Sequence, residues 1–355
     1  TGLRTIRVDT TMEGIAELTV DCVGDVDAVE ASISRQETQV TAALDLSGDR
    51  ATGVLEVEDV KCWGIGAPTL YRLEVRALLA GTVVDSYALD IGFRTMTVDG
   101  HRLLLNGEPV ELRGFGRHED FPVHGRGHDP AVMVKDFSLM EWCGANSFRT
   151  SHYPYAEEQL ALADRLGVLV ISESPAVSFR FDDDHDLSSR LTQWRRDLDE
   201  LVARDRNHPS VVMWSVGNEP MDFKPEAAPI ITEMIDRVRA LDPHRPVFVD
   251  SPLSHTIECH ESSDIVGLHA YPGWYSDQGD LAAGIAHTRE AIADLSQLGK
   301  PIVITEIGAD TIAGHHAHPP EMFSEEYQVE LVERVLDLVD DVEELAGVHW
   351  WNLCD

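Results

Sequence analysis

The stretch Val211-Val212-Met213-Trp214-Ser215-Val216-Gly217-Asn218-Glu219-Pro220 is a long apolar run that ends in a carboxylate. A second stretch, Pro301-Ile302-Val303-Ile304-Thr305-Glu306-Ile307-Gly308, repeats the pattern. Such runs are typical of buried strands, and a buried charge is costly unless something compensates it. We therefore expect two buried strands whose ends bring Glu219 and Glu306 to one functional site.

Strand-like and helix-like runs alternate on both sides of these two stretches. The expected strands are at residues 110–115, 145–149, 168–171, 211–216, 247–249, 265–269, 302–305 and 347–351, and the expected helices are near 130–142, 156–165, 188–205, 225–241, 281–298 and 324–345. Sustained alternation implies parallel strands with right-handed crossovers. Eight such units match a (β/α)8 TIM barrel, which is typically roughly 250 residues long. A doubly wound sheet is the alternative, but residues 113–117 lack its glycine-rich phosphate turn.

Residues 1–97 predict a separate domain. Short alternating runs at 3–9, 15–22, 26–34, 54–60, 70–79 and 83–93 are separated by turn residues and show no helical period. This pattern indicates an immunoglobulin-like β-sandwich. The expected architecture is therefore multidomain, with the sandwich at 1–97 followed by a catalytic TIM barrel at 98–355.

The charge balance limits the classes of partner. The formal net charge is −35, and the four lysines are Lys61, Lys135, Lys224 and Lys300. Nucleic acids and anionic membrane surfaces require basic patches, so neither is an expected partner. An acidic surface with few lysines resembles proteins of salt-loving organisms, and we expect strong salt to stabilise the chain. The five cysteines are scattered and odd in number, which favours reduced thiols over disulfides or a metal site.

The ends of the sequence carry expectations about location and completeness. No stretch approaches the roughly 20 apolar residues of a membrane span, and Thr1–Thr5 shows no signal peptide. This favours a cytoplasmic protein. The chain has no initiator methionine and ends inside an expected strand, so we interpret it as a fragment cut at both ends. Homo-oligomer formation stays open.

Several polar residues converge on one rim of the predicted barrel. Glu219 and Glu306 are 87 residues apart (306 − 219), which is three units of about 31 residues. They then end strands 4 and 7 at the carboxyl-terminal mouth, where barrel active sites form. The other expected strand ends add His118 after strand 1, Arg149 and His152 after strand 2, Glu173 after strand 3, Tyr271 and Tyr275 after strand 6, and Trp351 at strand 8.

Glycosidases usually have two carboxylate side chains that flank the glycosidic bond they cleave. One carboxyl group must be protonated near neutrality and the other ionised. We expect Arg149 to hold Glu306 ionised, Asn218 to bind a sugar hydroxyl beside Glu219, and the tyrosines to stack on sugar faces. Such chemistry needs no metal or organic cofactor. His315, His316 and His318 invite a metal interpretation, but we expect a solvated loop there, as for Asp182-Asp183-Asp184.

The chain resembles glycoside hydrolase family 2, and its β-glucuronidase branch in particular. The resemblance rests on residues 114–120, 144–155, 207–215 with 218–220, 305–306 with 308–314, and 323–328, and it spans about residues 106–352. It implies a retaining mechanism in which Glu219 is the general acid/base and Glu306 the nucleophile. His118, Arg149, His152, Asn218, Tyr271, Tyr275 and Trp351 match active-site positions of the family.

The resemblance also implies what lies outside the sequence and what departs from the family. A jelly-roll sugar-binding domain would precede Thr1, and the last barrel helix would follow Asp355. So would an Asn-x-Lys pair that grips the glucuronate carboxylate. His269 and Pro272 replace residues expected in Asn-x-Tyr-Tyr-Gly-Trp-Tyr, and Ile307 stands where tyrosine is common.

We therefore expect a retaining exo-β-glycosidase that hydrolyses small-molecule β-glycosides. Among these, β-D-glucuronides are the substrates that we favour. The alternatives are a β-galactosidase of the same family and a non-catalytic carbohydrate-binding protein on a hydrolase scaffold. Retention predicts a carboxyl separation of about 5–5.5 Å, whereas roughly 8 Å indicates inversion. We also expect the fragment alone to have little activity.

Overall fold

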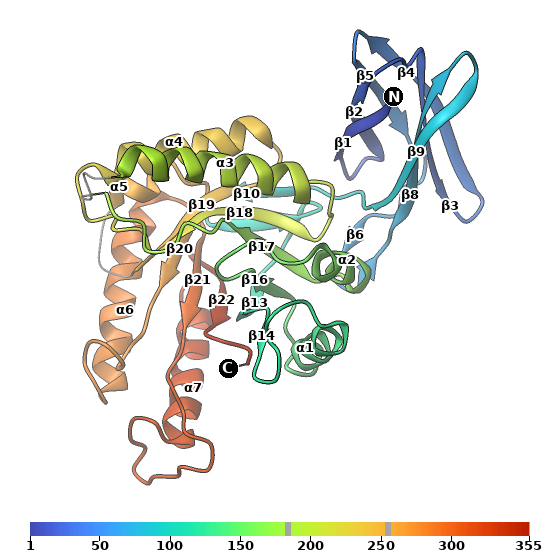
Figure 1. Cartoon of the computed structure of the whole chain (residues 1–355). Helices are drawn as coiled ribbons and strands as arrows, with labels where there is room; N and C mark the ends of the chain where they lie inside the picture. Colours follow the sequence, from blue (N-terminus) through green and yellow to red (C-terminus); the bar gives the residue numbers. More distant parts are fainter. Residues whose placement is uncertain (182–185, 253–256, 355) are drawn as a thin grey trace.

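The computed structural model describes residues 1–181, 186–252 and 257–354. Its two parts are a β-sandwich and a helix-wrapped barrel, which lie apart in Figure 1. The predicted fold class is confirmed. The aspartate run at 182–184 lies outside the described residues.

The sandwich is built from antiparallel strands in the order β1-β2-β5-β4-β3-β8-β9. Their bounds are β1 Gly2–Thr10, β2 Ile15–Val23, β3 Ala28–Arg35, β4 Thr38–Ser47, β5 Arg50–Glu56, β8 Tyr71–Leu79 and β9 Thr82–Ile91. Buried and exposed residues alternate along β2 and β8, as expected where one face of each strand packs on a core. The sequence missed β4, which buries only Leu44, and placed β5 four residues too late.

Short strands connect the two parts. The β6–β7 hairpin (Trp63–Gly64, Ala67–Pro68) precedes β8, and β10 (Met96–Asp99), β11 (Arg102–Leu105) and β12 (Glu108–Pro109) form a small sheet before the barrel. Trp63 is buried and donates from Nε1 to the Asp164 carbonyl at 2.7 Å. This small sheet was not expected from sequence.

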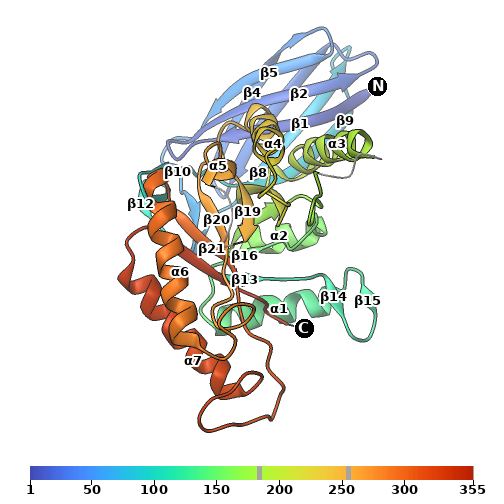
Figure 2. The ribbon, with the colours of Figure 1, turned by 90° about the vertical axis from the view of Figure 1, so that its left-hand side faces the viewer.

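The barrel closes through parallel strands β13-β16-β17-β18-β19-β20-β21-β22 within the described residues. Their bounds are β13 Leu112–Gly116, β16 Ser147–Arg149, β17 Leu169–Glu173, β18 Val211–Asn218, β19 Val247–Pro252, β20 Val266–His269, β21 Ile302–Ile307 and β22 Leu345–Trp350. All eight overlap their predicted positions. A small hairpin, β14 (Asp120–Phe121) with β15 (Gly125–Arg126), protrudes after β13 (Figure 2).

Helices surround the barrel strands (Figures 1 and 2). Their bounds are α1 Pro130–Trp142, α2 Glu157–Leu166, α3 Leu187–Asp205, α4 Ala227–Leu241, α5 Ile257–His260, α6 Leu281–Leu295 with the 3-10 turn Ser296–Leu298, and α7 Glu325–Asp341. α1 begins where predicted because Asp129 accepts from the Ala131 and Val132 amides and Pro130 occupies the first turn. Among the residues that the structure describes, no helix is both long and apolar enough to cross a membrane.

The clustered histidines precede α7. The His316 ring is exposed and its Nδ1 lies 2.8 Å from Glu326 Oε1, while His315 Nε2 lies 3.5 Å from Glu321 Oε1. Each of these two histidines therefore has its own carboxylate partner at the surface.

Candidate active site

Glu219 follows β18 directly. Glu306 is the next-to-last residue of β21, at the same mouth of the barrel. The Glu219 backbone has a φ of 44°, in the left-handed region that is unfavourable for a residue with a side chain. Its amide is held by the Asp250 carbonyl at 2.9 Å. Strained backbone of this kind gathers at functional sites. The pairing of β18 with β19 thus fixes the backbone position from which the Glu219 side chain extends.

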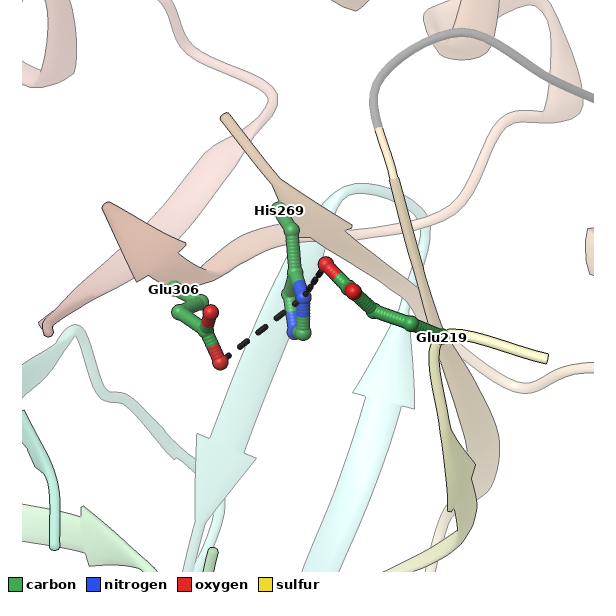
Figure 3. A group of neighbouring side chains, drawn as sticks. All are labelled: Glu219, His269 and Glu306. Atoms are coloured by element: carbon green, nitrogen blue, oxygen red, sulfur yellow. Dashed lines mark hydrogen bonds and ion pairs between the residues drawn. The ribbon is translucent and has the colours of Figure 1, made fainter. Parts of the chain in front are cut away.

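The two carboxylates lie close together with the His269 imidazole between them (Figure 3). The facing oxygens of Glu219 and Glu306 and the His269 nitrogen are all within 4.8 Å of one another. Retaining pairs are about 5–5.5 Å apart, whereas inverting pairs need about 6.5–9.5 Å to admit a water molecule. The separation is therefore of the short class.

Arg149, the last residue of β16, anchors the floor beneath the pair. It is fully buried and donates from Nη2 to Glu306 Oε2 at 2.5 Å, and from Nη1 to Glu173 Oε2 at 2.5 Å and Asn218 Oδ1 at 3.1 Å. Burial lowers its pKa, but the carboxylates of Glu173, Asp250 and Glu306 outweigh burial and raise the pKa. The expected ion pair between Arg149 and Glu306 is present.

The protonation of Glu219 differs from the expectation. A hydrogen bond between His269 Nδ1 and Glu219 Oε1, 2.9 Å long, lowers the pKa of Glu219 and outweighs its burial. Burial lowers the pKa of His269, but Glu306, Asp250 and Glu219 outweigh burial and raise that pKa to about 9. This order of the two pKa values favours the proton on His269 and the carboxylate form of Glu219.

A pocket of about 610 Å³ opens above the carboxylate pair. Seven of the predicted residues line it: His152, Asn218, Glu219, Tyr271, Tyr275, Glu306 and Trp351. Tyr271 donates from its hydroxyl to Glu306 Oε1. Trp351 stacks on His152 with ring centroids 5.2 Å apart and an interplanar angle of 16°. The wall is thus aromatic, as sugar rings prefer.

The remaining predicted residues, Arg149, Glu173 and His118, lie behind this lining. Glu173 is fully buried and accepts from Arg149 and from His152, whose Nδ1 is 2.8 Å from its Oε1. His118 packs edge-on against His152 and Trp351 at 5.6 and 5.4 Å between centroids. These three residues support the lining residues from behind. All ten predicted residues are brought together.

Two residues of the site were missed. His269 was noted only as a departure from the family pattern. Asp250 was not singled out, although Val247-Phe248-Val249-Asp250 carries the same signal of an apolar run ending in a carboxylate. Asp250 is fully buried, accepts from Ser215 Oγ at 2.5 Å, and lies 3.7 Å from His269 Nε2.

Glu219, His269 and Glu306 are close enough to reach a common cation. Arg149 already pairs with Glu306, however, and His269 Nδ1 already lies 2.9 Å from Glu219 Oε1. We therefore interpret the three as an acid–base group.

Comparison with known proteins is consistent with this geometry. A family model described as "Glycosyl hydrolases family 2" matches residues 4–94. A second model, described as "Glycosyl hydrolases family 2, TIM barrel domain", matches residues 96–355. A curated relative from Paenibacillus borealis, named "Beta-glucuronidase", is 40% identical over 99% of this chain and 60% of its own length. One of the same name from Felis catus is 42% identical over 81% of this chain and 45% of its own.

Solved structures agree in fold. The β-D-glucuronidase of Dictyoglomus thermophilum superposes with a TM-score of 0.89 at 36% identity, covering 99% of this chain and 62% of that one. The Bifidobacterium dentium β-glucuronidase complexed with coumarin-3-O-glucuronide gives 0.93 at 33%, covering 99% and 60%. The chain thus spans about 60% of the length of these relatives. With both of its parts matched to one family, the chain belongs to glycosyl hydrolase family 2.

Proposed function

We propose that the protein is a retaining exo-β-glycosidase that acts on terminal β-D-glucuronides. The observation that carries the proposal is the pair of carboxylates, Glu219 and Glu306, whose facing oxygens are within 4.8 Å at the floor of an aromatic-walled pocket. The choice of glucuronide rests on the relatives named β-glucuronidase and on the structural neighbour that holds a coumarin glucuronide. The substrate is a small-molecule glycoside.

Glu306 is the nucleophile in this mechanism. Its Oε2 accepts from Arg149 and its Oε1 from Tyr271, so donors hold both oxygens in place. Attack on the anomeric carbon forms a glycosyl ester while Glu219, in its acid form at this step, protonates the departing oxygen. Glu219, now a carboxylate, then takes a proton from water, whose oxygen displaces Glu306 from the sugar.

The test uses the full-length protein, compares aryl β-D-glucuronide with aryl β-D-galactoside, and follows the anomer of the product by NMR. We expect faster hydrolysis of the glucuronide and first appearance of the β-anomer. A preference for galactoside would replace the proposed sugar, and a first-formed α-anomer would exclude retention. No hydrolysis of either substrate would favour a binding protein on a hydrolase scaffold.

The nucleophile has a direct assay. Glu306→Gln is expected to lower kcat by about 10⁴-fold or more, and a 2-fluoro glycoside should label Glu306 covalently, as mass spectrometry would reveal. Glu333→Gln makes the same chemical change on the exposed face of α7 and should leave kcat unchanged. Unchanged turnover in Glu306→Gln would remove the catalytic assignment.

A further inference from the structure

The His269 ring stands between carboxylates that come from three neighbouring strands. Its Nδ1 lies 2.9 Å from Glu219 Oε1 and 3.8 Å from Glu306 Oε2, and its Nε2 lies 3.7 Å from Asp250 Oδ1. The side chain is 1% exposed. Nδ1 therefore faces Glu219 and Glu306 (Figure 3) and Nε2 faces Asp250, in a place that water hardly reaches.

The charges around this ring favour an imidazolium. The groups that face it are Glu219 after β18, Asp250 on β19, Glu306 on β21 and, as the one fixed cation among its described neighbours, Arg149 on β16. Arg149 is already shared between Glu306 and Glu173. A neutral ring would leave the buried carboxylates of Asp250 and Glu306 short of positive charge, which is costly.

The positions of the two ring protons follow from the contacts. Within the described residues, neither His269 Nε2 nor Asp250 Oδ1 has a hydrogen-bond partner, and the two atoms lie 3.7 Å apart as an ion-pair contact. Since Nε2 faces a carboxylate oxygen, it carries the proton that a neutral imidazole also keeps. The second proton of the imidazolium is then on Nδ1, in the 2.9 Å bond to Glu219. That bond places one mobile proton between a base and an acid.

We propose that His269 is a positioning residue that stores the proton which Glu219 delivers to the leaving group. This inference rests on the proposed function. Before substrate binds, the Nδ1–H group of His269 donates a hydrogen bond to the Glu219 carboxylate. Transfer along this bond gives a neutral imidazole and a carboxylic acid, and the acid then protonates the glycosidic oxygen as its bond to the anomeric carbon breaks.

The second half of the cycle restores the proton. While Glu306 is esterified it carries no charge, so one of the carboxylates that favours the imidazolium is gone. His269 then stays neutral and leaves the Glu219 carboxylate free to act as base. Glu219 takes the proton of the attacking water, Glu306 leaves as a carboxylate, and the proton returns to Nδ1. One proton leaves with the aglycone and one enters from water.

The pKa order supports this cycle. The pKa of His269 is raised to about 9 and that of Glu219 is lowered by their shared hydrogen bond. The His269–Glu219 pair therefore keeps its one proton well above neutral pH. A glutamic acid without this histidine has to hold the proton by itself and loses it at lower pH.

The kinetic test is His269→Asn with two aryl glycosides. For a poor leaving group such as phenol, we expect the alkaline limb of kcat/KM to move down by more than one pH unit, with a loss of about 10²-fold at pH 8. For 2,4-dinitrophenol, which leaves without a proton, kcat/KM should stay within about 3-fold of the unsubstituted protein. His128→Asn, at an exposed position, is the matched control and should change neither.

A purely structural role of His269 predicts equal losses for both leaving groups and an unmoved alkaline limb, and that result would overturn the proposal. Nitrogen NMR of the histidines in the substrate-free protein gives an independent measurement. We expect His269 to bear two N–H protons at pH 7 and to lose one of them near pH 9. In the Glu219→Gln variant, His269 should lose this proton at a lower pH. A neutral His269 at pH 7 in an active enzyme overturns the proton store, whereas failure of the unsubstituted protein to hydrolyse any glycoside overturns the proposed function.

Discussion

Arg149 donates from Nη2 to Glu306 Oε2 at 2.5 Å, with the arginine side chain fully buried. Arg149 also donates to Glu173 at 2.5 Å and to Asn218 at 3.1 Å, so one planar guanidinium joins β16, β17, β18 and β21. Lysine is a point charge on a flexible stem and cannot span these acceptors. The strands that carry the acidic residues are therefore tied together through a single side chain.

Arg149→Lys should lower kcat/KM by about 10²-fold or more, because Glu306 loses a fixed donor. It should also destabilise the fold by roughly 3 kcal/mol, since a buried carboxylate is left unpaired. Steady-state kinetics and urea unfolding measure the two effects. Arg113→Lys, in an exposed pair with Glu111, serves as control. Equal kinetics in the two variants would contradict the role of Arg149.

Tyr271→Phe removes the hydroxyl that donates to Glu306 Oε1. A hydrogen bond to a charged group contributes roughly 1.5–3 kcal/mol, so kcat should fall about 10–100-fold. The melting temperature should change little because the ring stays in place. Tyr87→Phe, on the exposed side of the sandwich, should leave kcat unchanged. A fall in KM alone would speak against a bond to the nucleophile.

Asp242→Asn tests a buried ion pair outside the pocket. Asp242 Oδ2 accepts from Arg245 Nη1 at 2.6 Å and from Trp214 Nε1 at 3.0 Å. The substitution should lower the free energy of unfolding by about 3 kcal/mol or more at pH 7. Asp236→Asn removes an exposed partner of Arg239 and should cost less than about 1 kcal/mol. Similar losses in both variants would refute the distinction.

The same aspartate predicts a dependence of stability on pH. Burial raises the pKa of Asp242, but Arg245 and the hydrogen bond from Trp214 outweigh burial and lower the pKa to about 2. Because the folded pKa lies below the unfolded value of about 3.9, this stabilisation is complete above that value and lost as pH falls toward 2. Urea unfolding of the Asp242→Asn variant should show a weaker decline between pH 4 and pH 2 than the unsubstituted protein.

Salt should stabilise the chain, which we propose as a halophile-like property. The formal net charge of −35 creates self-repulsion that molar KCl screens within a few ångströms. The melting temperature should therefore rise between dilute buffer and 2 M KCl. Sucrose at equal osmolality controls for solvent exclusion. A melting temperature that stays flat or falls in KCl would refute this prediction.

Local signals sufficed for much of the barrel. Apolar runs that end in Glu173, Glu219 and Glu306 located three strand ends to within two residues, and Asp129 with Pro130 located the start of α1. β4 was missed although Val40, Ala42, Leu44 and Leu46 alternate along it; only Leu44 is fully buried, and the other three pack partly buried against the sandwich core. Burial by distant strands is not visible within one such stretch.

The chemistry of His269 was beyond the reach of the sequence. Its meaning depends on three carboxylates that approach from β18, β19 and β21, and on ångström-scale distances to each. The sequence predicted a protonated Glu219 because the histidine was assigned no role there. Asp250 carries a signal that is visible in the sequence, because the apolar run Val247-Phe248-Val249 ends at its carboxylate.

The sandwich holds the strand that carries Glu219 at that strand's opposite end. Arg94 donates to the carbonyls of Pro209 and Val211 at 2.9 and 2.6 Å, and Asn207 exchanges hydrogen bonds with the backbone of Ile6 and Val8. Recombination that exchanges this sandwich for another would have to preserve these contacts, or β18 would shift along its length. The sandwich is thus not a freely exchangeable module, because its contacts help to set the position of the strand that Glu219 follows.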